Sequence, residues 1–148
     1  MKKGFTLIEL LVVIAIIGIL SAVVLASLNT ARNKGSDAAI QADLSSVRSQ
    51  AAIYFNENGN YGTVTEATTG CTAPNTFFVL DTTVATQVAA AENANGTTLG
   101  VVCNTAANGE AYAVSAALVA NSGSYFCIDS AGVATTTATG LGANTTCS

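Results

Sequence analysis

The sequence predicts an α+β protein in which one long N-terminal helix packs on a small antiparallel β-sheet head held together by disulfides. Three observations support this prediction. The run from Leu10 to Leu28 is almost entirely apolar and carries no charge. Apolar residues then recur at helical spacing toward residue 57, and the remainder contains short strand-like runs and four cysteines. With 148 residues, the chain has room for at most one globular domain beyond its helix.

The first 28 residues fit a helix that crosses a membrane. The charge-free run is long enough for a span of about 20 residues. Lys2 and Lys3 precede the run, and lysines beside a span favour the cytoplasmic side. The rest of the chain is therefore expected outside the cytoplasmic membrane.

Glu9 lies at the front edge of this apolar run. A carboxylate within a membrane helix costs up to roughly 3 kcal/mol at the helix centre and less near an interface. We interpret Glu9 as an unpaired acid that requires a partner cation. A cut after Gly4 would create an α-amine on Phe5, four residues before Glu9, and such an amine could be that cation.

The helix is expected to continue beyond the membrane. Ile40, Leu44, Val47, Ala51 and Tyr54 follow one another at steps of 4, 3, 4 and 3, which gives an apolar stripe of helical period. We read this stripe as core packing against the head. The residues around position 35 include a glycine and predict a bend or frayed turn, and an Asn-Gly pair at 58–59 predicts the end of the helix.

The part of the chain after residue 58 is expected to form the head. Residues 63–81 are rich in Thr and Gly and fit a loop, and apolar residues at steps of 4 and 3 predict a short helix over 83–93. Within 111–118, apolar residues alternate in the way that a sheet covered on one face requires. Strand-like runs lie at 99–103, 111–118 and 124–129, with a short fourth at 133–137.

The head contains the four cysteines, Cys71, Cys103, Cys127 and Cys147. An even number in a small exported domain suggests disulfides, and three pairings are possible. We favour Cys71–Cys103 and Cys127–Cys147, because the second would join the glycine-rich tail to a strand. Each is expected to stabilise the fold by roughly 3 kcal/mol. Zinc is the alternative, but the sequence has no histidine and no C-x-x-C pair, so no metal site is expected.

Charge and composition argue against several classes of function. No lysine or arginine follows Arg48, so the head is not expected to bind nucleic acid by itself. Without histidine and with carboxylates isolated along the chain, no catalytic constellation is found, and neither enzymatic activity nor a cofactor is expected. The segment Asp129-Ser130-Ala131-Gly132 could bind calcium, but this pattern is more often a turn.

Residues Gly4 to Glu9, in the order Gly-Phe-Thr-Leu-Ile-Glu, resemble the processing and assembly motif of type IV pilins and pseudopilins. The resemblance implies that a prepilin peptidase cuts between Gly4 and Phe5, that Phe5 is then N-methylated, and that Glu9 helps subunits assemble. It also implies a filament of further copies, assembled by an inner-membrane pilus or secretion machinery. Membrane lipid surrounds the helix before assembly.

The same resemblance implies a pilin-like fold with four parts. These parts are a leader at 1–4, a transmembrane and filament-core helix at 5–28, its amphipathic continuation at 29–57, and an exocytoplasmic head at 58–148. It places the chain across the cytoplasmic membrane once, with the head outside, and later in an extracellular or periplasmic filament. Ala26 stands where many pilins have a proline late in the apolar helix.

Other readings of the N-terminus stay open at this point. The segment could be a secretory signal peptide cut after Ala26, or the anchor of an exocytoplasmic binding module that does not polymerise. Within the filament class, the chain could be a pilus subunit or a type II secretion pseudopilin, and a major or a minor subunit. Adhesion, motility and DNA uptake are all compatible with the sequence.

Overall fold

The computed structural model describes residues 4–62, 68–69, 71–97 and 100–147. It confirms the predicted fold class, because a long N-terminal helix packs on an antiparallel sheet and the sheet region contains two disulfides. The elements are α1 (Leu7–Asn58), β1 (Thr68–Thr69), α2 (Phe77–Leu80), α3 (Thr82–Asn95), β2 (Val101–Thr105), β3 (Tyr112–Ala117), β4 (Tyr125–Asp129) and β5 (Ala134–Thr137).

Helix α1 is helical throughout its 52 residues. Residues 33–37 are all helical, so the frayed turn expected around Gly35 is absent. The helix ends as the sequence predicts, because Gly59 has a φ of 73° and donates its N–H to the Phe55 carbonyl at 2.8 Å. The chain forms two compact units, residues 1–33 and 34–148. We call the second unit the head unit.

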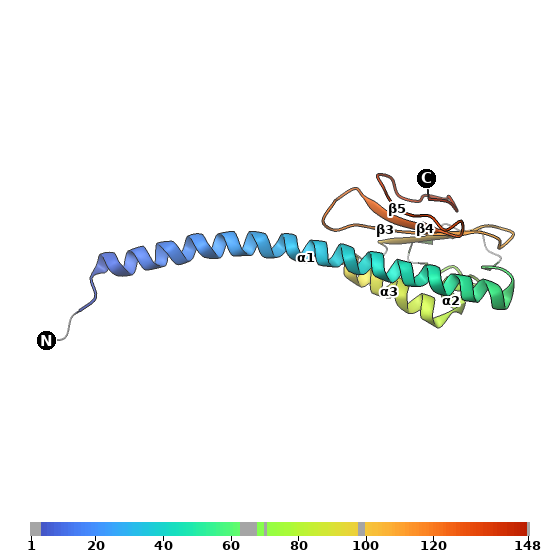
Figure 1. Cartoon of the computed structure of the whole chain (residues 1–148), viewed down its shortest axis with the longest axis horizontal. Helices are drawn as coiled ribbons and strands as arrows, with labels where there is room; N and C mark the ends of the chain where they lie inside the picture. The colour runs from blue at the N-terminus through green and yellow to red at the C-terminus, as the bar shows by residue number, and fades with distance from the viewer. Residues whose placement is uncertain (1–3, 63–67, 70, 98–99, 148) are drawn as a thin grey trace. The chain divides into compact units, whose positions relative to one another are not determined.

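The head unit is built around the predicted apolar stripe of α1. Ile40, Leu44, Val47 and Ala51 have no exposed surface and join one core with the inward side chains of β2, β3 and β4. Full burial of each larger side chain contributes about 1.5–3 kcal/mol. In Figure 1 the sheet lies above this half of α1, and α2 and α3 lie along its lower side.

The sheet is antiparallel throughout, with the strands in chain order from β1 to β5. Val101 pairs with Ala116 across β2 and β3, and Ala113 pairs with Asp129 across β3 and β4. The four predicted strands are present with small differences at their ends. The predicted start of the first, Leu99, lies outside the described residues.

Strand β3 differs from the prediction in one respect, because both of its faces are covered. Val114 and Ala116 face the helices, whereas Ala113 belongs to a second small core with Cys127 and Leu141. The second core is formed by the C-terminal tail, which folds back over the far side of the sheet. Alternation within β3 did not show this cover, because the tail lies more than 20 residues further along the chain.

Within the predicted loop at 63–81, residues 63–67 and 70 lie outside the described residues. The described residues include β1, which pairs with β2, and the short helix α2, so they are not all loop. Phe77 of α2 lies fully buried, with its ring centroid 5.3 Å from that of Tyr61 and 4.9 Å from that of Tyr112. Helix α2 is a single turn whose place is fixed by aromatic packing, so the Thr- and Gly-rich sequence around it gave no helical period to detect.

Helix α3 is capped at both ends. The Asp81 carboxylate accepts from the N–H groups of Thr83 and Val84 at 2.8 and 3.1 Å, which caps the first turn. Its other oxygen accepts from the Gln50 side chain at 2.8 Å. Asp81 therefore joins α3 to α1. At the other end, Gly96 has the left-handed conformation of a helix C-terminus, with a φ of 76°.

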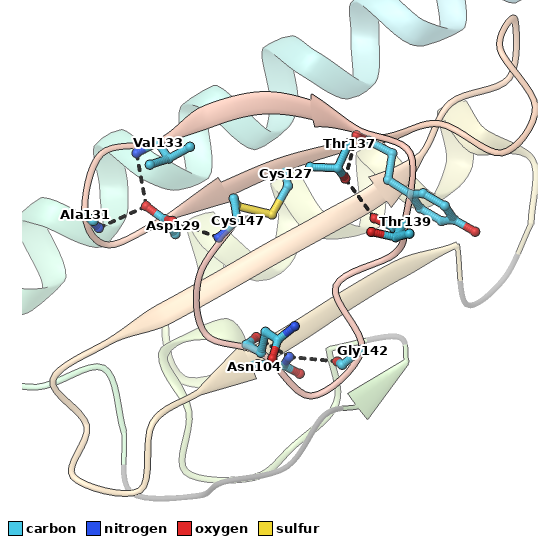
Figure 2. Close-up of a disulfide and its surroundings, with 11 residues drawn as sticks. Asn104, Cys127, Asp129, Ala131, Val133, Thr137, Thr139, Gly142 and Cys147 are labelled. Carbon is cyan, nitrogen blue, oxygen red and sulfur yellow. Dashed lines mark hydrogen bonds between the residues drawn. A yellow bond between two sulfur atoms is a disulfide. The ribbon is translucent and has the colours of Figure 1, made fainter.

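Two disulfides link β2 and β4 of the sheet to segments outside it. Cys71 is bonded to Cys103 of β2, and Cys127 of β4 is bonded to Cys147 in the tail. These are the pairs that the sequence analysis favours. Polar contacts reinforce the second bond, because the Asn104 amide donates to the Gly142 carbonyl at 2.9 Å and Cys147 N–H donates to the Asp129 carboxylate at 2.9 Å (Figure 2).

Non-reducing peptide mapping of the exported protein is expected to find two intramolecular disulfides, Cys71–Cys103 and Cys127–Cys147. The expectation follows from the geometry, with Cα–Cα separations of 5.0 and 5.7 Å. Reduction of both should lower the free energy of unfolding of the head by several kcal/mol, since each closure is worth roughly 3 kcal/mol. Four free thiols, or a Cys71–Cys127 peptide, would contradict the assignment.

Candidate processing and assembly segment

The residues just before α1 are held by local hydrogen bonds. Thr6 precedes the first helical residue, Leu7. The Glu9 carboxylate accepts from the Thr6 backbone N–H at 2.8 Å and from the Thr6 hydroxyl at 2.7 Å. The Glu9 N–H donates to the Thr6 hydroxyl oxygen at 3.3 Å. This is a capping box, in which a Thr before a helix and a Glu three residues later satisfy each other's backbone donors.

The capping box corrects the interpretation of Glu9 as an unpaired acid. In the isolated chain its carboxylate has a partner, Thr6, which supplies two hydrogen bonds and no charge. A Thr-x-x-Glu pattern before an apolar run is a known N-terminal helix signal and could have predicted these bonds. Both bonds end on Oε2, so Oε1 makes no hydrogen bond within the part of the chain that the structure describes.

The peptide bond between Gly4 and Phe5 is accessible. Phe5 is 84% exposed, and nothing lies within 4 Å of the place where a Cβ would stand on Gly4. The bond precedes the helix, in a stretch with no regular secondary structure. An enzyme that cuts at this point therefore meets no helix or strand in residues 4–6.

Helix α1 has an uncovered apolar surface directly after this segment. Every residue from Leu7 to Leu28 is exposed within its own unit, and the large apolar side chains among them are 46–88% exposed. By length and composition, α1 is able to cross a membrane. Such a surface requires lipid or protein to cover it.

The N-terminal segment matches a known family model. Residues 1–25 match the prokaryotic N-terminal methylation motif. The chain is also 46% identical over 59 residues to the type IV wide pilus major component PilA4 of Thermus thermophilus. The resemblance to type IV pilins is confirmed.

The pilin-type similarity covers only part of each protein. The aligned region is 40% of this chain and 45% of the Thermus relative, so the chain spans less than half of that relative's length. The motif match includes Gly4, Phe5 and Glu9. No solved structure matches the chain. The architecture of the head is therefore described from the structure of this chain, without a solved relative for comparison.

Outside the pilin-type segment, the buried acids of the head have structural partners. Asp37 of α1 is 8% exposed and accepts from Val119 N–H at 2.6 Å and from Ala120 N–H at 3.2 Å. It fixes the start of the head half of α1 to the loop after β3. A buried carboxylate of this kind is stable only while such donors are present.

The candidate calcium segment at 129–132 is a closed turn. One Asp129 oxygen accepts from Ala131 and Val133 N–H, both at 3.0 Å, and the other accepts from Cys147 N–H. Figure 2 shows these bonds. The carboxylate is thus occupied by backbone donors. Among the described residues, no group of three or more His, Cys, Asp or Glu side chains is arranged to hold a metal ion.

Proposed function

We propose that this protein is a structural subunit of a type IV pilus that polymerises through its N-terminal helix. The observation that carries the proposal is the methylation motif at residues 1–25, which includes the first part of an apolar helix whose surface is uncovered. Similarity to a major pilus component supports a pilus more than a secretion pseudopilus. A non-polymerising anchor is less favoured, because an anchor needs neither the Gly4–Phe5 junction nor Glu9.

The proposed sequence of events begins in the cytoplasmic membrane. The leader 1–4 lies on the cytoplasmic side, residues 5–28 cross the lipid, residues 29–57 continue the helix, and the head at 58–148 lies outside. A prepilin peptidase cuts between Gly4 and Phe5, and Phe5 is N-methylated. An inner-membrane assembly machinery then moves the subunit from lipid into an extracellular filament. The role of the protein is structural and not catalytic.

Glu9 is proposed to guide this transfer. Lipid covers the apolar helix about as well as neighbouring helices do, so burial alone gives little drive from membrane to filament. Cleavage creates an amine on Phe5, one helical turn from Glu9. An axial offset between subunits would bring that amine to Glu9 Oε1 of a neighbour, while Oε2 keeps its bonds to Thr6. A charge-assisted hydrogen bond in a medium of low dielectric constant then favours the filament.

N-terminal sequencing of the exported protein is expected to begin at Phe5, with the first residue methylated. The accessible Gly4–Phe5 bond and the motif match support this site. Electron microscopy of the sheared surface fraction should show filaments that contain the same processed chain. A mature terminus at Ser27, an intact Met1, or processed protein that never forms filaments would contradict the proposed function.

A further inference from the structure

One side of the head unit presents apolar side chains without cover. Ile53 of α1, and Val79 and Leu80 of α2, are 50%, 44% and 57% exposed. Gln50, one turn before Ile53, donates to Asp81, which directly follows Leu80, so this part of α1 lies next to the end of α2. We call this set the α2 face. Exposed apolar groups that gather in this way typically mark a contact with another protein.

A cavity of about 280 Å³ adjoins the α2 face. Its apolar walls include Phe78 and Val79 of α2 and Val88 of α3, and Glu92 of α3 also lines it. The Oε1 atom of Glu92 is buried and has no hydrogen-bond partner among the described residues. Burial also raises the pKa of the Glu92 carboxyl. A partner that supplies an apolar side chain would fill the cavity, and a cation that it places beside Glu92 would favour the ionised form of this carboxyl.

Another part of the same head presents such a pair. Val133, in the turn between β4 and β5, is 37% exposed. Arg48 of α1 donates from Nη1 to the Gly132 carbonyl at 3.2 Å, which holds its cation next to that turn. No lysine or arginine follows Arg48 in the sequence. We call Arg48 and Val133 the β4–β5 edge.

The two surfaces are formed by different parts of the head, the first mainly by α2 and α3 and the second by α1 and the β4–β5 turn. The sheet runs in order from β1 to β5, with the β4–β5 edge at its β5 end. Cys71, which lines the cavity, is bonded to β2 near the other end. A contact between two different surfaces of identical subunits is heterologous, so a pair of subunits still has one free surface of each kind. Repetition of such a contact produces an open helical filament when the rotation between subunits does not close into a ring.

We propose that the α2 face of one subunit receives the β4–β5 edge of a second copy, with Val133 against the apolar cavity and Arg48 near Glu92. This inference rests on the proposed function and adds the head contact that orders neighbouring subunits. The proposed contact is one that membrane lipid does not offer to the monomer, because both surfaces lie outside the apolar residues 5–28 of the helix.

A charge exchange in full-length chains tests the proposal. Arg48→Glu and Glu92→Lys each place like charges across the contact, and each is expected to reduce filament yield at least about tenfold. The double variant restores opposite charges and should recover most of the yield. Arg48→Gln keeps a donor for the Gly132 carbonyl without the charge and should be intermediate. Glu110→Lys has the same charge change as Glu92→Lys, lies on the β2–β3 turn outside the contact, and should form normal filaments.

Filaments are counted by electron microscopy, and correct disulfides together with an unchanged melting temperature show that each head is folded. Normal yield from both single variants would overturn the contact, as would a folded double variant no better than the single ones. In either case wild-type filaments would still support the proposed function. Absence of filaments from processed wild-type protein would contradict the proposed function itself, and this contact with it.

Discussion

A chain with Glu9→Leu is expected to be exported, cut after Gly4 and folded in its head, yet to form few or no filaments. The change removes the carboxylate that we propose meets the Phe5 amine of a neighbouring subunit. In a packed filament core, loss of one partner leaves the other charge buried alone, which can cost several kcal/mol. Since each subunit carries the defect, filament yield should fall by more than about tenfold. Immunoblotting for the processed chain and electron microscopy of sheared filaments measure the two effects.

The capping box requires controls that separate its loss from the loss of charge. Glu9→Gln keeps a side chain able to complete a capping box with Thr6 but has no charge, so it should still assemble poorly. Thr6→Val removes the hydroxyl bonds and leaves the Glu9 charge, at a cost of about 1 kcal/mol in helix stability, and should assemble well. Glu9→Asp should be milder than Glu9→Leu, because its shorter arm changes only the reach.

These controls also decide between roles for Glu9. If the carboxylate only caps α1, Glu9→Gln should form normal filaments and Thr6→Val should be defective. If it serves peptidase recognition, Glu9→Leu should remain uncut. Normal filaments from fully processed Glu9→Leu would exclude the assembly role.

The predictable parts of this fold are those with a local periodic signal. The stripe from Ile40 to Ala51 predicted the buried face of α1, and strand-like runs predicted β2 to β5. The processing motif was likewise contiguous, from Gly4 to Glu9. The capping bonds to Thr6 also had a local signal, the Thr-x-x-Glu pattern. We interpreted Glu9 from its charge instead, and so predicted a cation from outside the chain as its partner.

The features missed by sequence reasoning depend on residues far apart in the chain. Asp37 is buried because the loop after β3, more than 80 residues later, supplies its two donors. The tail covers the second face of β3 because Asn104 and Cys127 hold it there. The two proposed head surfaces also combine separate segments, since Val79 and Glu92 come to line one cavity, and Arg48 comes to lie beside the turn with Val133, only through packing.

Phe77→Ala is expected to have the largest effect on the stability of the head. Phe77 lies in a stretch that the sequence assigned to a loop, yet its ring is fully buried and contacts the rings of Tyr54, Tyr61 and Tyr112 at centroid distances of 4.9–5.9 Å. Truncation of a buried phenylalanine typically costs about 3–5 kcal/mol, because it removes apolar burial and leaves a cavity. The melting temperature should therefore fall by roughly 10–20 °C.

Val79→Ala, two residues further along α2, is the matched control. Val79 is 44% exposed, so its truncation should change the free energy of unfolding by less than about 1 kcal/mol. Thermal unfolding of both variants with disulfides intact makes the comparison. Equal and small effects would show that α2 is a peripheral loop, as the sequence first indicated. A large loss confined to Phe77→Ala would establish that this one turn closes the aromatic core between α1 and the sheet, and so holds the proposed α2 face in position.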